Sequence, residues 1–352
     1  MLQEITQSDG NLFYSQVWKN LIYGLCNTAA SATEFKLLFE KLLSLKDSDI
    51  ESIASEICLA LKKCSEVQNL IDFDKNLFIK VFDKILPFAS KVKVFSVEDD
   101  PFNTSETNYR TIWYDNAISH PIGYITQALI NLLISKSCGK CNEESLSFTR
   151  DFKNLWERVA GEECNIYVKA ILASKLYAMY VLIPEWTKTY IIPLFSWDNG
   201  NKQDAYQHWY AYLSYDLRRS KNLVYDIKKD LLISLENIES FTNDITRSNL
   251  IHLVISLWRE GDDDFKCIPS KLIKTEDQVS AVVFFEHKIR SSKSKKTINK
   301  EYNALKELLQ EFSKIKKPVD SKLSYWIIRI LLITPYTLYQ EEWDDFWSSK
   351  LV

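Results

Sequence analysis

The chain has 352 residues, a hydrophobic content of 46% and a formal net charge of −3 at pH 7. This composition excludes a largely disordered protein, because enough apolar side chains are present to form a core. The acidic balance argues against a general nucleic-acid-binding surface, since such surfaces carry an excess of Lys and Arg. Only 7 Gly and 8 Pro are present, which favours helices over folds that need many tight turns.

The first 91 residues have the apolar spacing of three and four that predicts amphipathic helices. Four such faces lie over residues 13–25, 35–43, 50–61 and 77–85. The helix predicted over residues 77–85 ends before Pro87, and Ser48 or Asp49 is positioned to cap the helix predicted over residues 50–61. We expect residues 1–91 to form an N-terminal helical bundle or repeat.

Residues 92–112 are the least helical part of the first half. Val92, Val94 and Ser96 alternate briefly, and Asp99-Asp100-Pro101 then turns the chain. We expect an irregular linker here, followed by a helical domain over residues 113–352.

Helical patterns resume in the second half and are interrupted over residues 184–200. Successive helices with short polar joints pair in antiparallel fashion and bury one face each. The predicted fold is therefore all-α, an irregular HEAT-like stack of helical hairpins (an α-solenoid), with an irregular helical domain as the alternative. No apolar run reaches the roughly 20 residues of a membrane span, and no signal-peptide pattern is present. We expect a cytoplasmic protein without a membrane partner.

The first candidate site is the polar turn that precedes the helix expected from Pro121. Pro is favoured at the first helical position, which leaves His120 as the cap. Gly123 costs a helix about 0.5–1 kcal/mol relative to Ala, which predicts that a backbone or a ring lies close to it. Either the turn binds a polar ligand at the helix N-terminus, or it ties a loop to the helix. The candidate residues are Trp113, Asp115, Asn116 and His120.

The second candidate site is aromatic. Trp197 follows a proline turn, and Trp209 and Tyr212 lie in the helix expected next. Trp and Tyr are enriched where proteins bind partners, but they also fill helix–helix corners. Both interpretations stay open.

The third candidate is a basic patch within residues 287–300, formed by Lys288, Arg290, Lys293, Lys295 and Lys296. Like charges create a local field that attracts nucleic acid or acidic protein. The stretch lacks interleaved aromatic residues for base stacking, so we favour an exposed loop between helices and do not expect a nucleic-acid partner.

No sequence motif for a metal, a cofactor or catalysis is complete. Cys138 and Cys141 form one C-x-x-C pair, but a zinc site needs a second pair or His ligands. The P-loop, the dinucleotide fingerprint and the nucleophile elbow are missing. We therefore assign no catalytic residue, no metal ligand and no cofactor.

Three motifs carry a family resemblance. The segments N-A-I-S-H-P-I-G-Y-I-T-Q-A-L-I, P-L-F-S-W and W-Y-A-Y-L resemble a C-terminal helical domain of unknown function that occurs in bacterial sirtuin-like anti-phage defence proteins. The resemblance covers about residues 109–213. The usual pattern has Asn where this chain has Ser119, and often Glu where it has Gln127.

The resemblance implies a non-enzymatic sensing or scaffolding module that binds a protein partner, such as an effector subunit or a phage protein. An effector enzyme would lie on another segment or subunit. Two alternatives stay open: an enzyme of another type with a pocket around His120 and Asp115, and a helical-repeat protein associated with nucleic acid.

Overall fold

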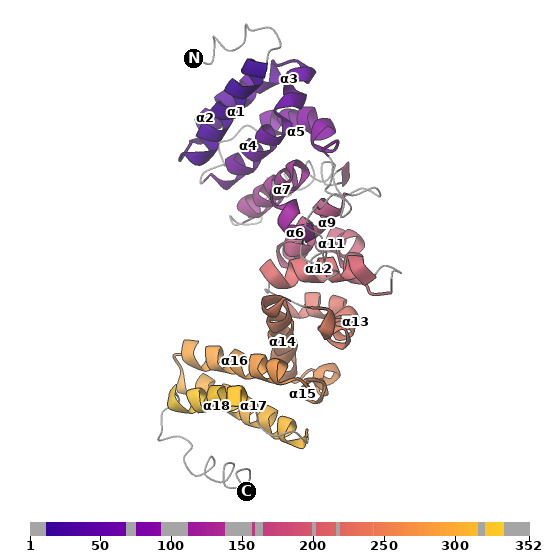
Figure 1. Ribbon diagram of the computed structural model, residues 1–352, viewed down its shortest axis with the longest axis vertical. Helices are drawn as coiled ribbons and strands as arrows, with labels where there is room; N and C mark the ends of the chain where they lie inside the picture. The colour runs from indigo at the N-terminus through magenta and orange to yellow at the C-terminus, as the bar shows by residue number, and fades with distance from the viewer. Residues whose placement is uncertain are drawn as a thin grey trace. The chain divides into compact units, whose positions relative to one another are not determined.

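A computed structural model of the chain describes residues 12–67, 75–92, 112–137, 157–158, 165–198, 202–215, 219–241, 243–315 and 321–333. Its regular structure there consists of α-helices and short 3-10 helices, with no strand among these residues, which confirms the all-α prediction. The chain divides into two compact units, Met1–Ser234 and Leu235–Val352. Figure 1 gives the helix labels.

The first unit begins with five helices: α1 (Leu12–Asn27), α2 (Ala32–Leu43), α3 (Asp47–Ser52), α4 (Ala54–Glu66) and α5 (Lys75–Ala89). α4 packs on α1 and α5, and α2 also packs on α5 (Figure 1). Large aromatic side chains, among them Trp18, Phe39 and Phe82, are fully buried there. The N-terminus of α2 has a capping box, in which the Ser31 backbone N–H donates to Glu34 Oε2 at 2.7 Å.

Three local predictions in this region were wrong. The helix expected over residues 50–61 is two helices, because the backbone of Ile53 leaves helical geometry at φ −124° and ψ 18° while its side chain stays buried. The N-cap of α3 is Lys46, not Ser48 or Asp49. α5 also continues past Pro87 to Ala89. A proline near the helix end removes only one backbone donor, and the side chain of Pro87 is exposed.

The first unit continues with α6 (Ile112–Ala117), α7 (Pro121–Ser137), α9 (Ile166–Ser174), α10 (Leu176–Leu182), α11 (Pro184–Tyr190), the 3-10 helix η5 (Ile192–Phe195), α12 (Lys202–Tyr215) and most of α13 (Lys221–Glu236). α4 packs extensively on α7, and α9 packs on α6, α7 and α12. The interruption expected over residues 184–200 is helical as far as Phe195. Pro184 starts α11, because Pro is pre-organised for a first helical turn.

The linker predicted over residues 92–112 lies outside the described residues apart from its two ends. Because α4 and α7 pack together, the helices on both sides of it belong to one unit.

The second unit contains η6 (Ile238–Ser240), α14 (Asp244–Arg259), η7 (Asp263–Phe265), α15 (Ile268–Lys271), α16 (Thr275–Ser291), α17 (Lys295–Lys314) and α18 (Ser321–Ile333). α16 lies at its centre and packs on α14, α17 and α18 (Figure 1). Across the described parts of both units, no helix has the length and apolar character needed to cross a membrane.

Buried carboxylates mark the interior of the second unit. Asp277, Glu286 and Glu301 are each about 2–3% exposed. Each contacts an arginine, because a buried charge without a partner is strongly unfavourable. The arginines are Arg247 for Asp277, Arg290 and Arg329 for Glu286, and Arg259 for Glu301.

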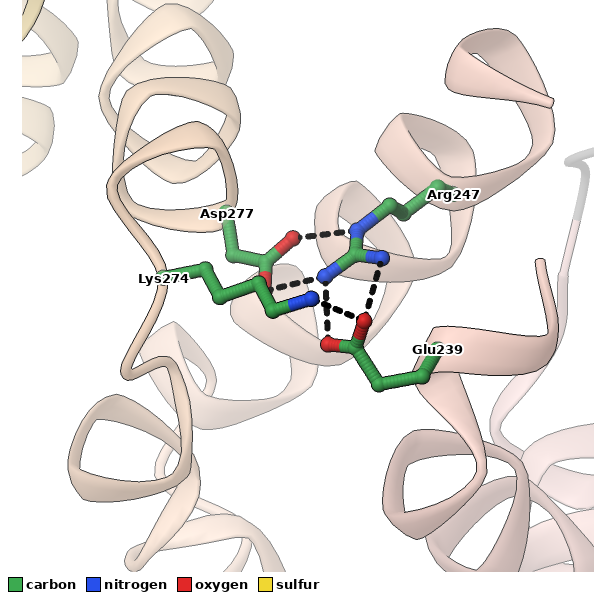
Figure 2. A network of polar contacts seen from close by, with 4 residues as sticks. All are labelled: Glu239, Arg247, Lys274 and Asp277. Carbon is green, nitrogen blue, oxygen red and sulfur yellow. Dashed lines mark hydrogen bonds and ion pairs between the residues drawn. The ribbon is translucent and has the colours of Figure 1, made fainter. Parts of the chain in front are cut away.

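Arg247 is the centre of the largest of these networks (Figure 2). Its Nε and Nη2 atoms donate to the two carboxylate oxygens of Asp277 at 2.6 and 2.8 Å. Its Nη2 atom also lies 2.9 Å from Glu239 Oε1, and Lys274 contacts the same carboxylate. These hydrogen bonds lower the pKa of Glu239 to about 2. The network therefore joins η6, α14 and the start of α16 through one guanidinium group.

Candidate functional site

The turn between α6 and α7 is held together by side chains of the first candidate motif. The backbone N–H of Ile122 donates to Nδ1 of His120 at 3.3 Å, so His120 caps the start of α7. The imidazole is buried, and its ring centre lies 4.8 Å from that of Tyr167 in α9. Pro121 is the first residue of α7, as the sequence predicted.

Gly123 brings α7 directly against the end of α6. A Cβ atom on Gly123 would lie 1.7 Å from the carbonyl oxygen of Ala117 and 2.8 Å from its carbonyl carbon. This confirms the prediction that a backbone lies close to the glycine. Gln127 closes the same turn, because its Nε2 donates to the carbonyl oxygens of Ile118 at 3.3 Å and Gly123 at 3.2 Å. A glutamate at position 127 would bring no donor at neutral pH.

The second candidate motif forms a buried aromatic cluster around Phe195. Nε1 of Trp209 donates to the Phe195 carbonyl oxygen at 3.0 Å, and the two rings are edge to face with centres 5.0 Å apart. Tyr212 contacts Phe195 in the same way at 6.0 Å. Nε1 of Trp197 donates to Ser234 Oγ at 2.9 Å, which ties the turn after η5 to α13. Trp197, Trp209 and Tyr212 are all buried. In this conformation they pack a helix corner.

The two motifs meet at the surface where α6 lies beside the end of α12. The rings of Tyr114 and Tyr215 stack with centres 4.0 Å apart and an interplanar angle of 28°. The hydroxyl of Tyr215 donates to Asp115 Oδ1 at 3.4 Å. Asp115 is exposed, Tyr215 is 48% exposed, and Trp113 and Asn116 are half-buried. We call Trp113, Asp115, Asn116 and Tyr215 the α6–α12 surface.

The tyrosine hydroxyl groups at this surface are hydrogen-bond donors. Partial burial, followed by the nearby Asp115 charge, raises the pKa of Tyr215 to about 12. Burial also raises the pKa values of Tyr114 and Tyr210. All three phenols are therefore neutral at physiological pH. His120 and Asp115 do not converge, because the imidazole is buried and bonded to backbone whereas the carboxylate is exposed and bonded to Tyr215.

Sequence reasoning missed Tyr114 and Tyr215. Tyr114 stands between two residues that were singled out, and Tyr215 lies three positions after Tyr212. Their pairing joins positions about 100 residues apart, and no local pattern identifies such a contact.

The basic patch lies at the joint between α16 and α17. Lys288, Arg290, Lys293, Lys295 and Lys296 are all exposed. The predicted loop is only Ser292–Ser294, so most of these residues belong to helix ends. Nη2 of Arg290 lies 2.6 Å from Glu286 Oε1.

The other chemical candidates add no site. Cys138 and Cys141 lie outside the described residues. Among those that the structure does describe, no group of three or more His, Cys, Asp or Glu side chains is arranged to hold a metal ion. Cys26, Cys58 and Cys64 are buried. Burial raises the pKa of Cys26 to about 11 and that of Cys64 to about 12, so both are unreactive thiols at neutral pH.

His208 in α12 predicts a pH dependence of stability. Burial lowers its pKa to about 4. Its Nδ1 donates to the Leu194 carbonyl oxygen at 2.9 Å, and Nε2 has no hydrogen-bond partner among the described residues. The unfolded chain, with an ordinary histidine pKa of about 6.5, takes up the proton first as pH falls. Stability is therefore complete above about pH 6.5 and is lost progressively toward pH 4.

We expect His208 to remove about 2 kcal/mol from the free energy of unfolding of the first unit between pH 7.5 and pH 5. Urea unfolding at the two pH values measures this loss. His208→Gln should reduce the difference, whereas His287→Gln, at an exposed histidine, should not. An equal pH dependence in wild type and His208→Gln would contradict the assignment.

Comparison with models of known protein families finds no match to the chain, and comparison with curated proteins finds none either. The resemblance to the helical domain of sirtuin-like defence proteins therefore stays a prediction made from the motifs.

Proposed function

We propose that this chain is a non-enzymatic sensor or scaffold module of a bacterial anti-phage defence protein. It would be built as a HEAT-like stack of helical hairpins and would act in the cytoplasm by binding a protein partner, either an effector subunit or a phage protein. The all-helical architecture and the motif resemblance support this proposal.

The accessible ring of Tyr215 on the α6–α12 surface is the observation that carries it. Tyr215 presents about half of its ring while the other face is held against Tyr114. A tyrosine that is already ordered loses little side-chain entropy on binding. Tyr and Trp dominate binding energy at protein interfaces. The adjacent Asp115 carboxylate would select a partner that offers Lys, Arg or amide donors.

Tyr215→Ala is expected to weaken partner binding by about tenfold to a hundredfold, the range of a hot-spot residue. The readout is protection of cells that carry the complete defence protein against phage, together with the melting temperature of the purified variant. Asp115→Lys should also weaken partner binding, because it reverses the charge next to the Tyr215 ring.

Tyr190→Ala is the matched control. Tyr190 is 47% exposed, nearly the same as Tyr215, and its ring also lies against another aromatic ring, that of Trp186 at 5.1 Å. Full protection by a folded Tyr215→Ala variant would contradict the proposal, as would an equal loss in both variants. His120 and Trp197 are unsuitable positions for this test, because their burial links any substitution to folding.

A further inference from the structure

The joint between α16 and α17 carries a positive charge that the described structure does not neutralise. Residues 287–300 contain six Lys or Arg and no Asp or Glu. Lys295 and Lys296 occupy the first turn of α17, where the helix dipole disfavours cations. The N-cap residue Ser294 makes no side-chain capping bond. We call Lys288, Arg290, Lys293, Lys295 and Lys296 the basic corner.

Few acidic groups contact the basic corner. Arg290 pairs with Glu286, and Lys288 lies 5.5 Å from the ring centre of Phe284. None of the residues that the structure describes forms an ion pair with Lys293, Lys295 or Lys296. An acidic group bound there would be stabilised both by these lysines and by the N-terminus of α17.

α18 adds an exposed apolar face in the same unit. Its Leu323, Ile327 and Ile330 side chains are buried. One turn apart on the opposite side, Tyr325 is 56% exposed and Ile328 is 49% exposed. Exposed apolar residues that lie side by side on a helix are suited to packing against another apolar segment.

A shared carboxylate places α18 next to the basic corner. Glu286 Oε1 accepts from Arg290 at 2.6 Å and from Arg329 of α18 at 3.2 Å. α18 ends four residues after Arg329, at Ile333, which is about 6 Å of helix. The chain beyond α18 therefore starts close to the basic corner.

That following chain contains a segment with complementary chemistry. Residues 341–347, which lie outside the described residues, read E-E-W-D-D-F-W and so combine four carboxylates with three large aromatic side chains. Seven residues separate Ile333 from Glu341, and they span up to about 25 Å when extended. A short tether gives an effective concentration in the millimolar range. This tether is long enough to bring the segment to the part of the basic corner that lies next to α18.

We propose that residues 341–347 bind in cis over the basic corner and the exposed face of α18. The carboxylates pair with Lys293, Lys295 and Lys296, and the aromatic rings pack on Tyr325 and Ile328. An acidic partner of this corner would have to displace the segment. The inference does not depend on the proposed defence function.

Zero-length crosslinking of the full chain tests the contact. A carbodiimide joins lysine amines to carboxylates that touch them, and peptide mass spectrometry locates the bonds. We expect crosslinks from Lys293, Lys295 or Lys296 to the carboxylates of residues 341–347, within the monomer and independent of protein concentration. The exposed pair of Lys271 and Glu236, 3.0 Å apart in the same unit, is the internal positive control.

Charge-reversal variants make the test specific. Lys293→Glu, Lys295→Glu and Lys296→Glu together should abolish these crosslinks and speed amide hydrogen exchange of residues 341–347 at least tenfold. Changing the four carboxylates of the segment to lysine in that variant should restore slow exchange. Crosslinks found only in covalent dimers would assign the segment to a second copy and overturn the proposal. Detection of the control crosslink between Lys271 and Glu236 without any crosslink to residues 341–347 would also overturn the proposal.

Discussion

Replacing Gly123 with alanine is expected to destabilise the first unit by at least about 3 kcal/mol, the upper end of overpacking costs. The new methyl group would lie 1.7 Å from the Ala117 carbonyl oxygen, and that atom belongs to backbone rather than to a flexible side chain. α7 must then move away from α6. The two hydrogen bonds of Gln127 across the turn would be lost with this movement.

Gly24→Ala is the control for this substitution. Gly24 lies within α1, and a Cβ atom there would meet nothing within 4 Å. Alanine has the higher helix propensity, so this variant should gain about 0.5–1 kcal/mol. Urea unfolding followed by circular dichroism compares the two. A Gly123→Ala variant as stable as wild type would show that the contact between α6 and α7 is looser than the structure indicates.

Asp277→Ala is expected to cost the second unit about 3–5 kcal/mol, the range for breaking a buried ion pair from one side. The Asp277 side chain is 4% exposed and that of Arg247 is 16% exposed. Removing the carboxylate takes away two charge-assisted hydrogen bonds and leaves the guanidinium group with Glu239 (Figure 2). The Glu239 side chain is more than half exposed. Hydrogen exchange of amides in α14 and α16 reports the loss directly.

Lys274→Ala gives the contrast within the same network. Its contact with Glu239 joins two side chains that are 53% and 55% exposed, and exposed pairs contribute about 0–1 kcal/mol. We expect Lys274→Ala to stay within that range. Equal effects of the two substitutions would mean that Asp277 is solvated in solution, contrary to its burial here.

The helical fold was predictable because it depends on local pattern. Apolar spacing located the helices between residues 12 and 89 apart from one break, and Pro121 marked the start of α7 correctly. Gly123 could be interpreted in advance because a glycine in a first helical turn is unfavourable unless something lies against it. The break at Ile53 was missed, since Ile53 continues the apolar pattern although its backbone leaves the helix.

The candidate sites were less predictable because burial depends on tertiary contacts. Trp197, Trp209 and Tyr212 are the residue types that proteins use both in cores and at interfaces, and sequence alone does not separate the two uses. The hydrogen-bond partner of Asp115 is Tyr215, which lies on a helix distant in the sequence. The arginine partners of Asp277, Glu286 and Glu301 are likewise 30 or more positions away, apart from Arg290.

The buried carboxylates of the second unit have a consequence for how its helices align. Apolar side chains tolerate a small slide between neighbouring helices, since one methyl group can replace another. A carboxylate in the interior does not, because it must face its own guanidinium group. Displacing α16 by a single residue would separate both Asp277 and Glu286 from their arginine partners. Electrostatic matching therefore selects one helix register in this unit.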